Sequence, residues 1–553
     1  MSAGLIVAVL VIALVARLFG IMHESSPAPD GSGEGATAAP SYPISGYFIS
    51  ASSSDETNQK KLTDIKALGG DTVITFGTLL KPATAEAMPA DCRIDGRSCA
   101  DAVADGIKVN RYFTYSDGSP WGTPAAKCPR DRATTSNGKH YTILVFPAKG
   151  NGCDSTNGSY DVILVGGSSE DAGDPSTSLA SASTDLDMNY YAGLPSPVKR
   201  SDPDYLPDLS YQRTLGLFTE RFLEYQAAVN DVPGLAGFYH HTEMPLTDSK
   251  TFDPILALYK MQNEAVHRVF PTRGAIVSPY LDTRRNAISI SLEEARKGSR
   301  RIAETSGGLL LNVAIQDGMG TGKAGAFLPQ EADAAVDRYA ATVVGEGTWA
   351  NKYVAPIKDY FLAAASGLAG TDAVLWANLE GMAPATPSNI CGNSLRGQSN
   401  KQRLDRQLQQ LSNAHKVVSF MWDSYYTCAG TGDPLKSQVK TGLATPIITD
   451  TKFHASKGDV EIAGFNLTGG AVGVSWTTHA GELKRSVVEP TGVDLTYGAE
   501  LGANPKLELI TVNVGATTID DRREFVVTVT NGWDEETQFV SQMASAPLQR
   551  SAQ

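Results

Sequence analysis

The sequence predicts an α/β protein in which a (β/α)8 barrel, or TIM barrel, is followed by a small all-β sandwich domain. Eight short apolar runs of high β propensity occur between residues 44 and 423, and a helix-like segment follows most of them. These runs are apolar without alternation, as expected of strands buried on both faces. From about residue 447 to 544 the pattern changes to short strands with turn signals, which is typical of a sandwich of immunoglobulin-like size.

The expected barrel elements can be placed by residue range. The eight strands are expected at residues 44–50, 71–77, 161–167, 234–240, 274–280, 309–315, 373–380 and 417–423. The helices are expected at residues 56–68, 211–230, 254–270, 292–305, 329–344 and 400–415. Eight strands that alternate with helices favour a closed barrel over an open sheet.

Two insertions interrupt the alternation of strands and helices. Residues 78–159 carry four cysteines, many Gly and Asn residues and two further β-like runs, which predicts a disulfide-pinned hairpin excursion. Residues 168–210 are polar and proline-rich, and we expect a loop there. Both insertions should leave the carboxyl-terminal rim of the barrel, where substrate clefts are built.

The N-terminal region predicts a protein that is exported and held at the membrane. Residues 1–22 are mostly apolar and have neither a charged leading segment nor a clear cleavage site, so a signal anchor fits slightly better than a signal peptide. Residues 23–43 are rich in Ser, Pro, Gly and Ala, which predicts a flexible linker. The barrel domain is then expected at residues 44–445 and the sandwich at 446–545. The sandwich could bind carbohydrate or serve as a spacer.

The six cysteines fall into neighbouring pairs along the chain. These pairs are Cys92 with Cys99, Cys128 with Cys153, and Cys391 with Cys428. Fifteen pairings are possible, but sequential pairing would staple loops. None of the pairs has the C-x-x-C spacing of a zinc or thioredoxin site, so we expect disulfides and an extracytoplasmic, oxidising compartment. Six unpaired thiols in a cytosolic enzyme are the alternative.

Composition excludes nucleic acid as a partner. The 553 residues include 47 Lys and Arg against 60 Asp and Glu, which gives a formal net charge of −13. Phosphate binding requires a clustered basic face, and the sequence shows none. A neutral polymer or a small molecule is therefore the expected ligand. The oligomeric state stays open.

Two glutamates follow the apolar runs of the fourth and seventh expected strands. Glu243 comes just after residues 234–240, and Glu380 ends the run at 373–380. The carboxyl ends of barrel strands meet at one mouth, so both side chains are expected there. Glycoside hydrolysis needs one carboxylic acid to protonate the leaving oxygen and a second carboxylate to attack the anomeric carbon or activate water. The sequence thus predicts a glycoside hydrolase that needs no metal or organic cofactor.

This pattern resembles the large clan of retaining barrel glycosidases, which carry glutamates after strands four and seven. The segments GFYHHTEMPL, SPYLDTRR and WANLEGM also resemble a barrel family catalogued as glycosidases of unknown function, over roughly residues 44–428. The resemblance implies that Glu243 is the acid/base and Glu380 the nucleophile. The clan has Asn directly before the acid/base, where it contacts the sugar 2-hydroxyl, whereas this chain has Thr242. His241 or Asn378 could supply that contact instead.

Further candidate residues lie at or just beyond strand ends. Asp282 could contact substrate or form an ion pair with Arg284, and Asp317 is the main rival carboxylate. The aromatic candidates could stack on sugar rings or belong to the barrel core. The substrate-binding candidates are His241, Tyr280, Asp282, Arg284, Gln316, Asp317, Trp376, Asn378, Trp422, Asp423 and Tyr425.

Two alternatives to a cell-wall or extracellular polysaccharide hydrolase remain at this level. One is a non-catalytic polysaccharide-binding or assembly protein on a barrel scaffold. The other is a metal-dependent hydrolase or deacetylase that uses His240, Asp282 and Asp317. Neighbouring side chains on a strand point to opposite faces, so His240 and His241 are not expected to bind one ion; one should pack and the other should line the cleft. The glycine-rich segment 318–325 lacks the Ser or Thr of a phosphate loop and is expected to be a rim loop.

Overall fold

The computed structural model describes residues 40–541, except 392, 431, 479, 516–518, 520–523 and 534; for 393–394 and 535–541 it describes the backbone alone. The expected signal segment and most of the expected linker lie outside the described residues. In the described part of the chain, no helix combines the length and the apolar character that crossing a bilayer requires.

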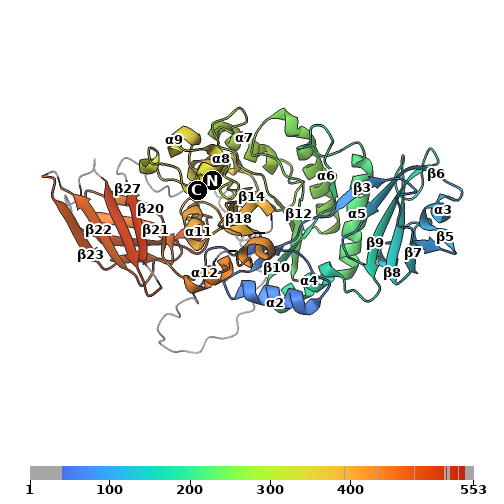
Figure 1. Ribbon diagram of the computed structural model, residues 1–553, viewed down its shortest axis with the longest axis horizontal. Coiled ribbons are helices and arrows are strands. Elements are labelled where there is room, and N and C mark those ends of the chain that lie inside the picture. The colour runs from blue at the N-terminus through green and yellow to red at the C-terminus, as the bar shows by residue number, and fades with distance from the viewer. Residues whose placement is uncertain are drawn as a thin grey trace, which may run out of the picture. The chain divides into compact units, whose positions relative to one another are not determined.

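Eight parallel strands form a closed barrel (Figure 1), which confirms the predicted fold class. In chain order they are β1 (Gly46–Phe48), β2 (Thr72–Ile74), β10 (Asn189–Gly193), β12 (Leu235–Tyr239), β13 (Gly274–Val277), β14 (Leu311–Gln316), β15 (Val374–Glu380) and β19 (Lys416–Phe420). All of them except β10 lie within or overlap the expected ranges. β1 pairs with both β2 and β19, which closes the barrel.

The predicted third barrel strand is wrong. Residues 161–167 belong to β9 (Ser159–Ser169), which lies in a separate sheet. The third barrel strand is instead β10, inside the segment expected to be a loop, which also contains α4 (Pro175–Asp185). A long apolar run shows that a strand is buried but not which sheet buries it. Because one strand replaces another, β12 is still fourth and β15 still seventh.

The first insertion is larger than the expected hairpin excursion. It builds most of a six-stranded sheet whose strands follow the order β11, β3, β6, β9, β8, β7. Apart from β9, these are β3 (Leu79–Ala83), β6 (Lys108–Tyr115), β7 (Arg132–Ser136), β8 (Lys139–Pro147) and β11 (Ser196–Pro197). Since β11 follows the third barrel strand and pairs with β3, the sheet joins the segments that leave the second and third barrel strands.

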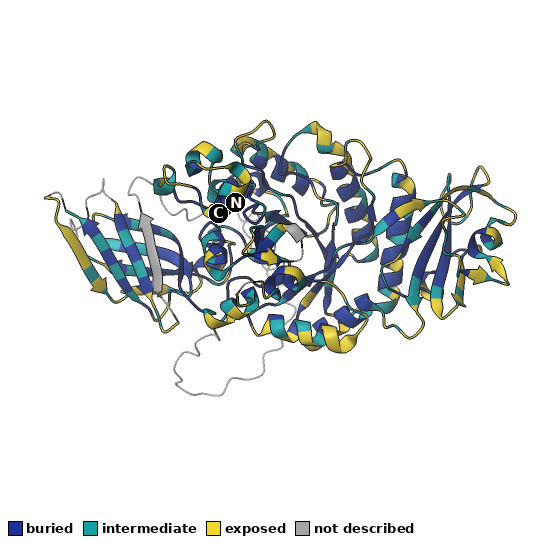
Figure 2. Ribbon diagram, viewed as in Figure 1, coloured by how far each residue is buried: buried dark blue, intermediate teal, exposed yellow. Residues whose placement is uncertain are grey.

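Helices accompany the barrel strands, and Figure 2 shows them buried along one side and exposed along the other. Those at the expected positions are α2 (Asp55–Lys66), α5 (Gln212–Val229), α6 (Asp253–Val269), α7 (Leu292–Ala303) and α11 (Lys401–Leu408). The helix expected at 329–344 is reduced to a short turn and α8 (Arg338–Val344). The helix that precedes β15 in the chain is α10 (Ile357–Leu368), which was not predicted from the sequence.

The sandwich consists of two four-stranded antiparallel sheets, as predicted. The first contains β20 (Ile447–His454), β21 (Asp459–Phe465), β25 (Leu507–Asn513) and β24 (Gly492–Asp494). The second contains β23 (Leu483–Val488), β22 (Ala471–Thr477), β26 (Phe525–Thr530) and β27 (Glu535–Ser541). Alternate residues of β21, β22, β25 and β26 are buried in one shared core, which is the period of a strand with a single buried face.

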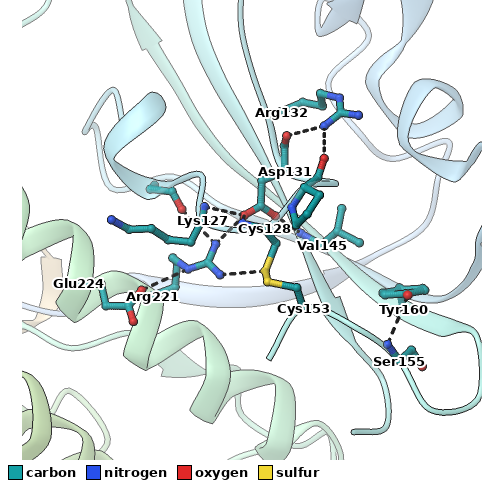
Figure 3. The surroundings of a disulfide bond; sticks show 12 residues. Lys127, Cys128, Asp131, Arg132, Val145, Cys153, Ser155, Tyr160, Arg221 and Glu224 are labelled. Carbon is teal, nitrogen blue, oxygen red and sulfur yellow. Dashed lines mark hydrogen bonds and ion pairs between the residues drawn. A yellow bond between two sulfur atoms is a disulfide. The ribbon is translucent and has the colours of Figure 1, made fainter. Parts of the chain in front are cut away.

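All three predicted disulfides are present: Cys92–Cys99, Cys128–Cys153 and Cys391–Cys428. Beside the second of them, Asp131 accepts hydrogen bonds from the backbone N–H groups of Lys127, Cys128 and Val145 (Figure 3). The Nη1 atom of Arg221, on α5, forms a buried ion pair with Asp131 at 2.7 Å. This ion pair fastens the insertion to a barrel helix.

Replacing Arg221 with Met is expected to destabilise the protein by about 3 to 5 kcal/mol, because it leaves the buried Asp131 carboxylate without its cation. The matched control is Arg268→Met, since Arg268 of α6 pairs with Glu220 of α5 in solvent. That loss should be within about 1 kcal/mol. Chemical denaturation of both variants checks the prediction, and equal losses would contradict it.

Candidate active site

The alternation of side chains along β15 points Glu380 into the barrel mouth. Leu375, Ala377 and Leu379 pack in the core between strands and helices, whereas Trp376 belongs to the cluster inside the barrel. Residues two apart on a strand share a face, so Glu380 faces the interior at the carboxyl end of the strand.

Two residues of the loop after β14 act on the Glu380 carboxylate: Thr321 donates hydrogen bonds to it, and Lys323 places a positive charge near it. The backbone N–H of Thr321 donates to Oε2 at 2.6 Å and its hydroxyl donates to Oε1 at 3.3 Å. Glu380 is only 4% exposed, and burial raises its pKa. The bonds from Thr321 and the positive charge of Lys323 oppose that rise because they stabilise the carboxylate.

Glu243 is the solvent-exposed member of the pair. Although the residue is exposed, desolvation of its carboxyl raises the pKa of Glu243 to about 7. The negative charge of Glu380 adds to the rise, whereas a hydrogen bond from Gln316 and the charge of Lys323 oppose it. The two glutamates therefore interact with one another and share Lys323 as a neighbour.

Asp317 lies beneath Glu380 with no solvent exposure. Its Oδ1 atom accepts from the backbone N–H groups of Glu380 at 3.2 Å and Met319 at 3.3 Å, and its Oδ2 atom accepts from Gln407 at 2.7 Å. Burial, followed by the charge of Glu380, raises the pKa of Asp317 to about 7. These contacts hold Asp317 against the backbone of Glu380, and its side chain has no exposure to solvent.

The glycine-rich segment 318–325, predicted to be a rim loop, contacts Glu380 through Thr321. It carries both Thr321 and Lys323, and the Lys323 ammonium lies 4.3 Å from the centre of the Tyr280 ring. Gly320 allows the loop to approach closely, because a Cβ atom there would lie 2.6 Å from the Cβ atom of Glu380. The signal in the sequence was the position of this loop directly after the sixth strand.

Replacing Gly320 with Ala is expected to lower kcat about 100-fold or more, because the added methyl group must displace Glu380 or Met382. Gly432→Ala serves as the control, since its Cβ atom would meet open space. A Gly320→Ala enzyme with wild-type kcat and unchanged thermal stability would show that the close approach of the loop is not needed.

The remaining polar candidates divide between the mouth and the packed interior. Gln316 donates to the Ser278 carbonyl at 2.9 Å and also contacts Glu243. Asn378 is buried, and its Nδ2 atom donates to the Ser278 hydroxyl at 3.0 Å. Half-buried His241 has its Nδ1 atom against the carbonyl oxygen of Gly77. Gln316 and His241 are thus available at the mouth, whereas Asn378 supports it from below.

Asp282 and Arg284 form a two-pronged ion pair with distances of 2.8 and 2.5 Å. Both carboxylate oxygens of Asp282 accept hydrogen bonds from Arg284, which fits the ion-pair alternative for Asp282. Asp423 pairs with Lys61 at 2.6 Å and accepts from the Ser50 backbone at 2.6 Å.

Three of the four aromatic candidates are buried in the structure. Trp422 is 2% exposed and stacks on Tyr426 with ring centres 5.7 Å apart. Trp376 packs edge-on against Tyr191 inside the barrel. Tyr425 is covered by the small cluster around the Cys391–Cys428 disulfide. These rings belong to the core here, and Tyr280 is the partly exposed aromatic candidate.

The side chains of the metal-dependent alternative are engaged elsewhere. Both ring nitrogens of buried His240 face amide oxygens, from Gln262 at 3.1 Å and Asn263 at 2.7 Å, and burial lowers the His240 pKa to about 4. Asp282 and Asp317 have the partners given above. Within the described ranges, no three His, Cys, Asp or Glu side chains are gathered as a metal would require. His240 is buried, whereas the adjacent His241 is half-buried.

No family model matches the sequence, and no curated protein matches it. Among solved structures, a supposed alpha-L-fucosidase from Bacteroides thetaiotaomicron is 11% identical, with a TM-score of 0.41 over 76% of this chain and 99% of its own. An endo-beta-1,4-mannanase from Thermotoga petrophila is 10% identical, with a TM-score of 0.27 over 91% and 97%. Beta-glucuronidase 2 from Bacteroides uniformis is 8% identical, with a TM-score of 0.33 over 91% and 46%. Likeness at this level carries no argument about activity, which the residues of the site must supply.

Proposed function

We propose that the protein is a glycoside hydrolase that cleaves a cell-wall or extracellular polysaccharide with retention of configuration. One observation carries this proposal: two interacting glutamates at the ends of the fourth and seventh barrel strands have different surroundings. Glu243 is open to solvent with its pKa raised to about 7, whereas hydrogen bonds from Thr321 hold Glu380. Paired carboxyl groups in different environments are what acid and nucleophile roles require.

In the proposed reaction Glu380 attacks the anomeric carbon while Glu243 donates its proton to the departing oxygen. The bond between the sugar and the leaving group breaks as the bond to the Glu380 oxygen forms. Glu243, now ionised, then removes a proton from water, and the resulting hydroxide displaces Glu380 and releases the sugar. Thr321 and Lys323 stabilise the negative charge of Glu380 before attack and after release.

Thr242 stands where the clan has Asn, and its side chain is engaged. Its hydroxyl lies 2.9 Å from the hydroxyl of Ser196, in the segment after the third barrel strand. Asn378 is buried, so the contact to the sugar 2-hydroxyl falls to His241 in our proposal. His241 lies two residues before Glu243 and is half-buried.

The three disulfides are typical of proteins from oxidising compartments. We propose an extracytoplasmic enzyme, held at the membrane or released according to whether its N-terminal segment is retained. The proposed domains are a catalytic barrel with the disulfide-pinned insertion and a separate sandwich.

A screen for released reducing ends tests the activity. The purified wild-type protein and the Glu243→Gln and Glu380→Gln variants are each incubated with a panel of cell-wall and extracellular polysaccharides. We expect the wild type to cleave at least one polymer and both folded variants to lose that cleavage. Full cleavage by either variant would overturn the assignment of that residue.

A further inference from the structure

A cavity of about 180 Å³ lies at the carboxyl ends of the first three barrel strands. Thr75 and Phe76 after β2 and Tyr190 of β10 line it from the barrel, and Asp117 lines it from the insertion. The volume equals that of about six water molecules at liquid density. This is the size of one sugar ring rather than of an oligosaccharide.

The cavity adjoins the proposed catalytic mouth. The ring of Phe76, which lines it, lies 5.4 Å from the ring of His241 and 5.8 Å from that of Tyr239, measured between ring centres. His241 and Tyr239 belong to the segment that ends in Glu243. The cavity therefore lies beside the segment that carries Glu243.

Asp117 lines the cavity with a carboxylate whose hydrogen bonds from other residues are made at one oxygen. Its Oδ1 atom accepts from the Trp121 indole and from the Ser119 backbone, both at 3.0 Å. Among the described residues, no other residue donates to its Oδ2 atom. Burial, and to a smaller extent the charge of Asp174, raises the pKa of Asp117 to about 6, so it is mostly ionised at neutral pH.

The cavity contains no cation to balance Asp117. None of the described residues that line it is Lys, Arg or His. Lys61 donates to the carbonyl oxygen of the lining residue Ser50 at 2.6 Å, but it already pairs with Asp423 at 2.6 Å. A ligand that brings a positive charge would therefore supply the missing partner.

The rest of the lining suits a sugar. The hydroxyls of Thr75 and Tyr190 lie 3.0 Å from one another, and Ser176 adds a third hydroxyl. The partly exposed ring of Phe76 provides apolar surface for the C–H face of a pyranose. Apolar walls with a few convergent polar groups are the usual composition of a small-molecule site.

We propose that this cavity is a subsite for a sugar unit that carries a free amino group, with the ammonium paired to Asp117. The inference that the substrate is a polysaccharide with de-N-acetylated hexosamine units rests on the proposed glycosidase function, whereas binding in the cavity does not. Neutral or N-acetylated units lack the charge and should bind more weakly.

The test uses the Trp121 indole N–H, which donates to Asp117, as a probe. The full chain labelled with ¹⁵N-tryptophan is titrated at pH 7 with glucosamine, glucose or N-acetylglucosamine, and the Trp121 signal is identified by its loss in Trp121→Phe. We expect glucosamine to shift this signal saturably, with a Kd at least tenfold below that of glucose. Asp117→Asn should weaken glucosamine binding at least tenfold, and Asp171→Asn, an exposed acid in the turn before α4, should not.

Equal affinity for glucose and glucosamine, or unchanged affinity in Asp117→Asn, would overturn the proposal. The other indole signals report whether each variant is folded. If the protein binds glucosamine but cleaves no polymer, the proposed glycosidase function is contradicted and the subsite proposal is supported. If the protein cleaves polymers but glucosamine does not bind in the cavity, only the subsite proposal is contradicted.

Discussion

Replacing Glu380 with Gln is expected to lower kcat by at least about 10⁴-fold, on every substrate that the wild type cleaves, because the amide cannot attack the anomeric carbon. The fold should persist, since Gln keeps the shape of the side chain and can still accept a bond from Thr321. Steady-state kinetics on the polymer found in the screen measures the loss.

The activity of Glu380→Gln should also be insensitive to the reactivity of the leaving group. A better leaving group should not restore Glu380→Gln, because bond formation to the sugar is what the variant lacks. Glu331→Gln is the control: Glu331 pairs with Arg406 and accepts from the Leu328 backbone, and this variant should keep wild-type kcat. Strong rescue of Glu380→Gln by a dinitrophenyl glycoside would contradict the nucleophile assignment.

Replacing Glu243 with Gln is expected to lower kcat about 10²- to 10⁴-fold on natural linkages, because the leaving oxygen departs without a proton. The loss in the first step should be much smaller on dinitrophenyl glycosides, whose leaving group needs no proton. Comparing pre-steady-state bursts on the two substrates checks the prediction. Equal losses on both would contradict the acid role.

The pH dependence of the wild type follows from the same group. An acid catalyst acts only when protonated, and the Glu243 pKa is raised to about 7, so kcat/KM should fall as pH rises through about 7. The descending limb should disappear from the residual activity of Glu243→Gln on a dinitrophenyl glycoside. A limb that persisted there would assign the titration to Asp317 instead.

Much of the barrel could be predicted from sequence because parallel strands buried on both faces are continuous apolar runs. The exception is instructive. The run in β9 is longer and more apolar than the short strand β10, so it was assigned to the barrel, although the insertion sheet buries it. Periodicity reports burial, and the choice of sheet depends on contacts between distant segments.

The positions of Glu243 and Glu380 were predictable because strand ends converge in a barrel. The residues around them were not. Thr321 and Lys323 lie on a loop that approaches Glu380 closely at Gly320. Asp317 is buried and accepts hydrogen bonds from the Glu380 backbone and from Gln407. Such roles depend on distances that no local sequence pattern encodes.

Identifying the residue that becomes covalently bound to the sugar during turnover is the most direct test of the proposed retaining mechanism. The 2-deoxy-2-fluoro analogue of the sugar that the screen identifies is supplied with an activated leaving group, and the protein is digested and analysed by mass spectrometry. We predict the mass of one sugar on the peptide that contains Glu380, and none in Glu380→Gln. A product released with inverted configuration, or a sugar attached to another residue, would contradict the proposed retaining pair.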